Sequence, residues 1–317
     1  MFYRPAGSTS WETRDWDWSL RSVAQRIKDS REAVVKEESD KVKSIACIWD
    51  DALLTNEEGY LLFKFFQALG VPVQHKGRHP GALPFRDWLS INDGCSPDAS
   101  NDPALTDWLR SGDTRGLLIW GGGLLTHGPE NEMLNVLQSV GWLVLVDWFK
   151  TREDFAAKCE RITDTCPRAE IFLLPAAAPW EKSGSWISAG RWLQWCAKAT
   201  EPQEPVRPPL WMIDRLFKAL RDLYREGGAS PQRILKIKWD YAGNTVPDVE
   251  LVAAEICSCF GEDERVSSEQ TKSSAESSMT CGSQMDTGYW GGKALTMRRS
   301  LDHGRWGFLL PQQHQYL

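Results

Sequence analysis

Three short apolar runs, separated by segments of helical length, constrain the fold of this chain most strongly. The runs lie at residues 117–120, 142–147 and 170–174, and the second contains the uninterrupted sequence LVLV. The segments 130–140 and 152–162 between them have patterns typical of helices. Strand–helix–strand units of this size form parallel sheets with right-handed crossovers. The sequence therefore predicts an α/β fold: a Rossmann-like, three-layer parallel sheet with helices on both faces.

Ligands of such sheets bind at the carboxyl ends of the strands. Those ends carry Gly121, Gly122 and Gly123 after the first strand, Asp147 after the second and Pro175 after the third. We expect these residues to lie together at one edge of the sheet. Glycine-rich turns with free backbone amides suit a phosphate group. A tight bend between strand and loop is the alternative explanation of the three glycines.

We expect residues 1–75 to form an N-terminal block. Its elements are a charged helix, a buried strand and a second helix, over residues 19–38, 44–49 and 56–69. Thr55 and Glu58 have the spacing of a capping box, in which each side chain bonds the backbone amide of the other residue. Gly70 suits the end of the second helix. We expect neighbouring carboxylates such as Glu57 and Glu58 to act as helix caps.

Composition shifts divide the rest of the chain. Residues 76–114 are rich in Gly and Pro and are expected to be a loop-rich connection, and 115–259 are expected to form the Rossmann-like domain. Late in that domain we expect an amphipathic helix, an alternating strand and a further helix, over residues 211–226, 234–241 and 248–259. Residues 260–317 are expected to be a low-complexity loop followed by an irregular C-terminal tail.

Bulk properties exclude several classes of protein. The formal charge of −6 argues against nucleic acid as the main partner. No run approaches about 18 apolar residues, so no membrane span is expected. The first residues lack the apolar core of a signal peptide, which gives a cytoplasmic expectation. The 8 cysteines form no CxxC pair, which argues against a zinc or iron–sulfur site. The 17 tryptophans are expected to anchor the core and interfaces.

One segment identifies a family. Residues 170–205 read EIFLLPAAAPWEKSGSWISAGRWLQWCAKATEPQEP. This segment resembles the region near the bis-pyranopterin cofactor in the large subunit of formate dehydrogenases, which belong to the molybdopterin oxidoreductase family. The resemblance is carried by the motifs LPAA, EK, G and GRWLQW, at residues 174–177, 181–182, 184 and 190–195. It extends over two blocks, residues 4–75 and 82–255.

The resemblance implies a chemistry. In the family, two pyranopterin guanine dinucleotides hold molybdenum or tungsten, which takes two electrons from formate to give CO2. It implies cofactor contacts by Glu181, Lys182, Arg191 and Gln194, beside Asp147 and the glycine turn. The planar donor fork of Arg191 suits a pyrophosphate. A surface loop with solvated charges is the alternative for these polar residues.

The same comparison indicates that reactive parts are missing. The family places a metal-ligating cysteine or selenocysteine between an arginine and a histidine, where this sequence reads Gly-Arg78-His79-Pro. Arg78 and His79 are therefore expected to be remnants, with no metal ligand beside them. His127 is a loop residue or a ligand. The cysteines of the family's N-terminal iron–sulfur cluster are also absent, so no such cluster is expected.

Three hypotheses follow from these departures. In the first, the chain is a shortened or partial large subunit that is inactive alone. In the second, it is a non-catalytic pseudo-enzyme or scaffold that binds other redox subunits. In the third, a second polypeptide supplies the missing block. The pterin cofactor is retained in some of these cases and lost in others. Large subunits of this family are often periplasmic, in contrast to the cytoplasmic expectation from this sequence.

Overall fold

A computed structural model gives the arrangement of most of the chain. It describes residues 1–33, 44–49, 53–71, 73–75, 114–121, 137–149, 152–187, 192–243, 246–258, 287–290, 293–299 and 306–309. The predicted connection at 76–114 lies almost entirely outside these residues, as does most of the predicted helix at 130–140.

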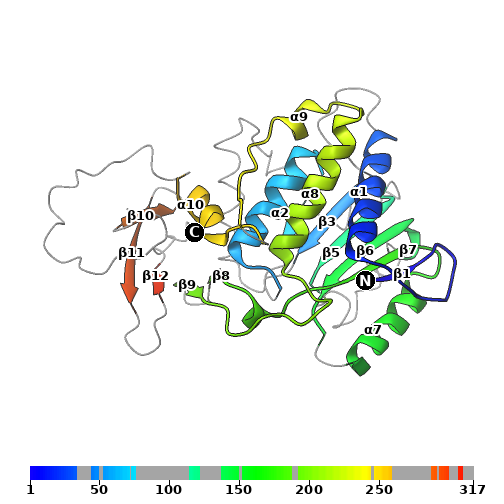
Figure 1. Cartoon of the computed structure of the whole chain (residues 1–317), viewed down its shortest axis with the longest axis horizontal. Coiled ribbons are helices and arrows are strands. Elements are labelled where there is room, and N and C mark those ends of the chain that lie inside the picture. The colour runs from blue at the N-terminus through cyan, green and yellow to red at the C-terminus, as the bar shows by residue number, and fades with distance from the viewer. Residues whose placement is uncertain are drawn as a thin grey trace, which may run out of the picture.

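A seven-stranded sheet forms the centre of the molecule (Figure 1). Its strand order is β2-β1-β7-β6-β5-β3-β4. The strands are β1 (Phe2–Arg4), β2 (Glu12–Thr13), β3 (Ile45–Trp49), β4 (Val73–His75), β5 (Gly116–Trp120), β6 (Trp142–Asp147) and β7 (Glu170–Pro175). β7, β6, β5, β3 and β4 run parallel, whereas β1 pairs antiparallel with β7 and with β2. Strands from the N-terminal block and from the later domain therefore share one sheet.

Helices cover both faces of this sheet. The helices α1 (Trp16–Glu32), α2 (Asn56–Ala68) and α8 (Pro209–Arg225) lie side by side on one face, and α7 (Arg152–Thr165) lies on the other (Figure 1). Side chains alternate between the faces, as a strand requires. In β6, Val144 and Val146 pack under the three helices, whereas Leu143 and Leu145 pack against the α7 side. The predicted three-layer α/β fold is confirmed.

Local sequence signals set the helix ends. The capping box of α2 is present: the Glu58 amide donates to Thr55 Oγ1 at 3.2 Å and the Thr55 amide donates to Glu58 Oε2 at 2.9 Å. Gly70, with φ of 70°, follows the end of α2. α1 begins at Trp16, earlier than predicted, because Asp15 accepts a hydrogen bond from the Trp18 amide at 2.7 Å and caps the helix.

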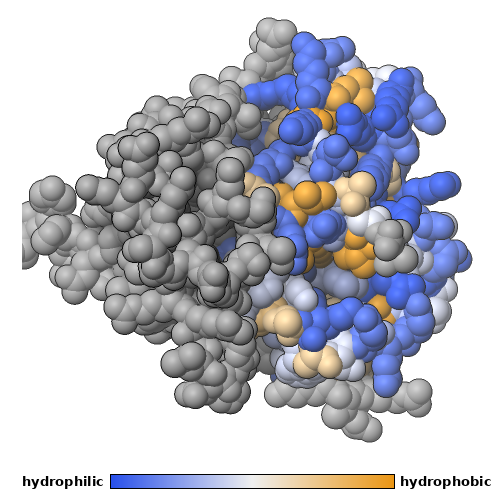
Figure 2. Space-filling model, turned by 60° about the vertical axis from the view of Figure 1, so that its left-hand side comes forward, coloured by the Kyte–Doolittle hydropathy of each residue, from blue (hydrophilic) through white to orange (hydrophobic). Residues whose placement is uncertain are grey.

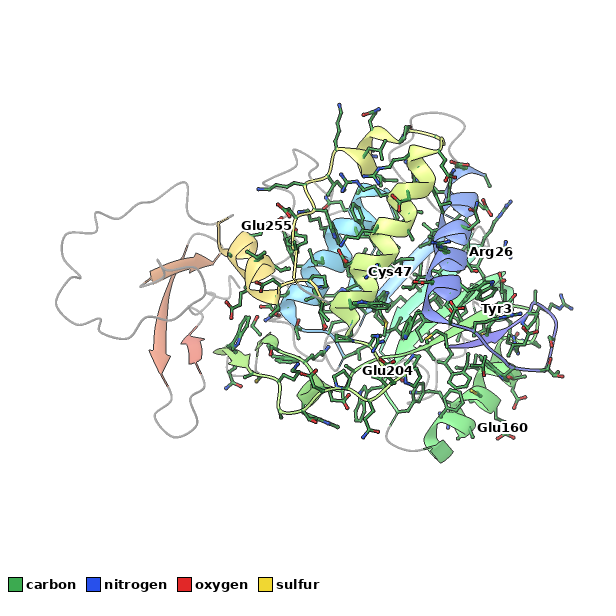
Figure 3. All side chains as sticks on the ribbon, in the orientation of Figure 1. Tyr3, Arg26, Cys47, Glu160, Glu204 and Glu255 are labelled. Carbon is green, nitrogen blue, oxygen red and sulfur yellow. The ribbon has the colours of Figure 1, made fainter. Side chains whose placement is uncertain are left out.

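Polar contacts join the N-terminus to the sheet. The Tyr3 hydroxyl donates to Glu170 Oε1 at 2.8 Å, and Arg26 Nε donates to Glu170 Oε2 at 2.6 Å. Tyr3 and Arg26 lie near each other at the β1 end of the sheet (Figure 3). Arg4 is fully buried, and its guanidinium donates to the Ala169 carbonyl at 3.0 Å and to that of Cys166. These contacts fasten β1 and α1 to β7 and to the chain that leads into it.

The prediction of a strand at residues 234–241 is wrong. The chain forms a short helix, α9 (Gln232–Leu235), and then runs along α8 without a strand partner. The Trp239 ring stacks on Phe217 with centroids 4.0 Å apart, and its Nε1 donates to Asp214 Oδ1 at 2.9 Å. Alternate residues face inward because an extended chain packs on a helix here, which gives the same pattern as a strand.

A second, antiparallel sheet has the order β10-β11-β12-β9-β8. Its strands are β8 (Gly184–Ile187), β9 (Trp192–Cys196), β10 (Thr287–Trp290), β11 (Lys293–Arg299) and β12 (Trp306–Leu309). Residues 287–309 of the C-terminal tail, which we expected to be irregular, thus contain three strands. The turn η1 (Pro179–Glu181) connects β7 of the first sheet to β8 of the second. The helix α10 (Val249–Ser258) lies between β9 and β10 in sequence and matches the predicted helix at 248–259.

Within the described residues, no helix combines the length and the apolar character needed to cross a membrane. On the face shown in Figure 2, the described surface is largely hydrophilic, with small apolar groups between the polar side chains.

Candidate functional site

The order of the parallel strands creates a switch point between β3 and β5. From β3 the chain passes through α2 to β4 on one side, whereas β5, β6 and β7 follow on the other side. Connections that leave in opposite directions open a crevice at the carboxyl ends of the two strands, where ligands of such sheets bind. The carboxyl edge of the sheet is therefore the candidate site.

Three predicted residues meet at this edge. The Gly121 amide donates to the Val146 carbonyl at 2.8 Å, and Asp147 lies opposite Pro175 in the strand register. The Ala176 amide donates to the Asp147 carbonyl at 2.8 Å. Gly121 has a φ of 109°, which a residue with a side chain rarely adopts, so the chain turns sharply at the end of β5. The predicted meeting of these strand ends is confirmed; Gly122 and Gly123 lie outside the described residues.

An unused donor lies at the switch point. Trp120 ends β5 opposite Trp49 in the register and is 1% exposed. Its indole N–H has no acceptor among the residues that the structure describes. A buried donor without a partner costs about 1–3 kcal/mol.

Asp147 is neutralised by a neighbour. Its carboxylate is buried, forms an ion pair with Lys158 and accepts a hydrogen bond from the Trp148 amide at 2.9 Å. Burial, together with the nearby Arg161, lowers the pKa of Lys158 to about 8. The carboxylate therefore contributes little net negative charge to the edge, which favours an anionic ligand there.

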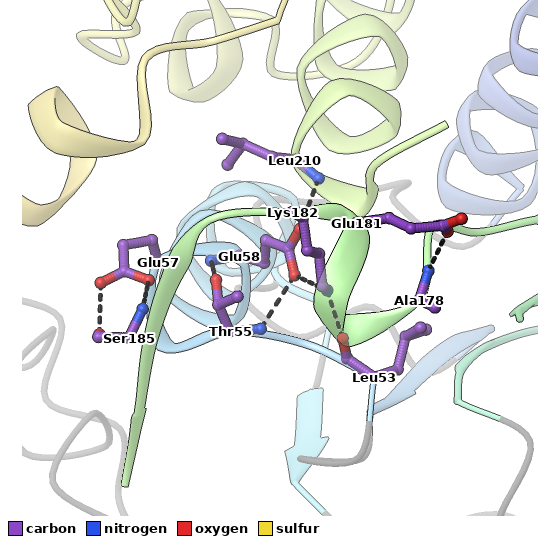
Figure 4. Close-up of polar contacts among 9 residues, drawn as sticks. All are labelled: Leu53, Thr55, Glu57, Glu58, Ala178, Glu181, Lys182, Ser185 and Leu210. Carbon is purple, nitrogen blue, oxygen red and sulfur yellow. Dashed lines mark hydrogen bonds and ion pairs between the residues drawn. The ribbon is translucent and has the colours of Figure 1, made fainter. Parts of the chain in front are cut away.

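The predicted pair Glu181 and Lys182 is held by internal bonds (Figure 4). Glu181 Oε2 accepts from the Ala178 amide at 2.8 Å and closes the η1 turn. Lys182 is 4% exposed, and its ammonium donates to the Glu58 carboxylate and to the Leu53 carbonyl. A contact of Lys182 with a cofactor would require it to leave this ion pair. The cofactor contacts of both residues stay predictions.

A second carboxylate fastens the same segment. Glu57 is 2% exposed; its Oε2 accepts from the Ser185 amide at 2.8 Å and its Oε1 from the Ser185 hydroxyl. A Cβ atom on Gly184 would lie 2.6 Å from Thr55 Cγ2, so only glycine permits this approach. Sequence reasoning found the capping box but missed these partners. The retained EK and G residues of the family motif were the available signal.

The cluster combines two carboxyl groups with one ammonium. Glu58 Oε1 also accepts from the Leu210 amide at 3.2 Å, so this carboxylate touches the first turn of α8 as well as that of α2. Burial lowers the pKa of Lys182, opposed by the charge of Glu58. Burial raises the pKa of Glu57, opposed by its hydrogen bonds with Ser185.

The other predicted residues are not brought to the edge by the described structure. Gln194 is exposed on β9, whereas Arg191, Arg78, His79 and His127 lie outside the described residues. Across the described ranges, no group of three or more His, Cys, Asp or Glu residues could hold a metal ion.

The chain is similar in sequence to several known proteins. No family model matches the chain. The alpha subunit of formate dehydrogenase 2 (cytochrome c-553) from Nitratidesulfovibrio vulgaris is 33% identical over 135 residues, which are 42% of this chain and 13% of that protein. The formate dehydrogenase-O major subunit of Escherichia coli is 27% identical over 155 residues, 47% of this chain and 15% of that protein. The formate dehydrogenase alpha subunit of Megalodesulfovibrio gigas is 28% identical over 139 residues, 43% and 14% of the two chains.

These matches are all alpha or major subunits of formate dehydrogenases. Part of this chain is similar to the alpha or major subunits of formate dehydrogenases, which confirms the resemblance seen in the sequence. The chain spans only 13% to 15% of the length of these curated relatives.

The buried pair yields a first prediction. Lys182→Met removes the cation from a site where the two side chains are 3% and 2% exposed and leaves the Glu58 charge unpaired. We expect a loss of about 3–5 kcal/mol in the free energy of unfolding, measured by urea denaturation. Lys198→Met, in the exposed pair with Glu201, is the matched control and should cost less than about 1 kcal/mol. Equal effects of the two variants would contradict the buried pair.

Glu57 yields a prediction about pH. Because its pKa is raised above the ordinary 4.5, the folded protein holds this proton more tightly than the unfolded chain. Its contribution to stability is therefore present below pH 4.5 and is lost as the pH rises through the raised pKa. Glu57→Gln removes this dependence, so the variant should gain stability relative to wild type as the pH rises. Denaturation curves across this range give the test, and a constant difference would refute the raised pKa.

Proposed function

We propose that the chain contributes the α/β part of a formate dehydrogenase-type large subunit and holds the guanine dinucleotide end of a pterin cofactor at its carboxyl edge. The similarity to formate dehydrogenase subunits, found together with a sheet whose strand ends at Gly121 and Asp147 meet at one edge, carries this proposal. In support, the switch point of the strand order lies at this edge, and ligands of such sheets bind at switch points.

The residues present fit the nucleotide end of this cofactor better than its metal end. The chain turns sharply at Gly121, and Lys158 balances the Asp147 carboxylate. Arg191 is proposed as the pyrophosphate contact. When bound, the cofactor supplies the metal that accepts two electrons from formate. The chain's own residues bind and orient the dinucleotide.

The metal end needs groups that this sequence does not place together. Arg78 and His79 are adjacent, and no cysteine stands between or beside them. We propose that the chain alone does not oxidise formate, and that a second polypeptide with the missing block, or other subunits of the complex, would be required. No iron–sulfur cluster is proposed for this chain.

A non-catalytic scaffold is the second candidate. The observation in its favour is that Glu181 and Lys182, two residues of the family motif, are held by bonds inside the fold. A scaffold would retain these residues for stability whether or not a cofactor binds.

Activity separates the partial subunit from a complete enzyme. The purified chain, supplied with formate and an artificial electron acceptor dye, should show no reduction above a heat-treated control, because the metal ligand is missing. An active formate dehydrogenase in the same assay serves as the positive control. Formate-dependent dye reduction by the isolated chain would refute the hypothesis that the catalytic block is missing.

Nucleotide binding separates the cofactor-binding subunit from the scaffold. A charge-assisted hydrogen bond contributes about 1.5–3 kcal/mol, so Arg191→Ala should weaken GDP binding roughly ten- to a hundredfold in calorimetric titration. Arg215→Ala, which removes an exposed arginine of α8, is the matched control and should leave the affinity unchanged. The absence of binding by the wild-type chain would leave the scaffold as the better account.

A further inference from the structure

An exposed tryptophan stands beside the carboxyl edge. Trp180 lies in η1, five positions after Pro175 at the end of β7. Its side chain is 52% exposed, and the other exposed large apolar side chain among the described residues is Leu251 at 44%. Tryptophan carries the largest apolar surface of any side chain and is usually covered. Because it is exposed beside the candidate ligand-binding edge, Trp180 is a candidate ligand contact.

The backbone that carries Trp180 is fixed on both sides. The Ala199 amide donates to the Trp180 carbonyl at 2.9 Å, and the bond from Glu181 to the Ala178 amide closes the turn. The next residue, Lys182, is locked in the buried pair with Glu58. An exposed side chain on so constrained a turn loses little conformational freedom when a ligand binds.

The ring of Trp180 is supported from one side. Trp148, directly after Asp147, meets it edge to face, with centroids 5.3 Å apart and planes at 80°. Because Trp148 is partly buried against the core, it connects the exposed ring to the end of β6. This arrangement leaves surface of the Trp180 ring accessible to a planar group, which is the geometry that heteroaromatic bases use for stacking.

One cation lies on the segment that is bonded to this turn. The Lys198 amide donates to the Ser183 hydroxyl at 3.0 Å, and the amide of the next residue, Ala199, donates to the Trp180 carbonyl. The ion-pair partner of Lys198, Glu201, is 77% exposed. Exposed ion pairs contribute about 0–1 kcal/mol, so a phosphate could replace this carboxylate at small cost. Arg207 is a different case, because its guanidinium pairs with Glu204 and lies over the Trp211 ring, 5.7 Å from the centroid.

We propose that Trp180 is the stacking platform for the base of a nucleotide, with Lys198 as a contact for its phosphates. This inference rests on the proposed function, because it assigns the base of the dinucleotide to a particular place on the carboxyl edge. A protein surface covering Trp180 would need no phosphate contact, whereas the neighbouring Lys198 complements an anionic aromatic ligand.

The test compares ring variants in calorimetric titrations with GDP, ADP and ribose 5-phosphate. Trp180→Ala should weaken binding of both nucleotides by roughly tenfold or more, since base stacking on an aromatic ring is sequence-tolerant. Trp180→Phe should keep most of the affinity. Ribose 5-phosphate, which has no base, should bind wild type and Trp180→Ala equally weakly. Leu251→Ala is the matched control for loss of an exposed apolar side chain and should bind as wild type does.

The outcomes separate the two proposals. If wild type binds GDP and Trp180→Ala binds it equally well, the stacking platform is refuted and the proposed function stands. If wild type binds neither nucleotide, both are refuted. Circular dichroism of each variant checks that the fold is intact, and Trp180→Phe distinguishes loss of the ring from loss of the turn.

Discussion

The buried ion pair between Lys182 and Glu58 is the interaction on which the carboxyl edge depends. It joins the first turn of α2, the segment after β7 and, through the Leu210 amide, the first turn of α8. A charge in so dry a place is tolerated only when its partner and its hydrogen bonds are complete. Glu57 adds a further attachment at Ser185. Three elements far apart in the sequence therefore have one fixed arrangement around a single ammonium group.

Much of the fold was accessible from the sequence because its signals are local. The apolar runs of β5, β6 and β7 and the capping box of α2 each lie within a few residues, and the structure confirms them. The partner of Lys182 could not be found in this way, since Glu58 lies 124 positions away. The prediction for segment 234–241 failed for a different reason. Alternate residues, such as Trp239 on Phe217 of α8, pack inward from an extended chain and imitate the pattern of a strand.

The candidate site was predictable in its position and less so in its contacts. Parallel strands bring their carboxyl ends to one edge whatever the side chains are, so Gly121, Asp147 and Pro175 were expected to meet there. The roles of Glu181 and Lys182 depend on which way their side chains point, which spacing does not reveal. Both are used inside the fold. A retained family motif therefore indicates a retained loop before it indicates a retained activity.

The distribution of covered and uncovered surfaces explains how a chain that matches only 13% to 15% of its relatives' length still holds a parallel sheet. Parallel sheets require cover on both faces. Here α1, α2 and α8 cover one face and α7 the other, all from this chain. The carboxyl edge, in contrast, has the exposed Trp180 ring beside it. A ligand or partner would therefore find more uncovered apolar surface at this edge than on the helix-covered faces of the sheet.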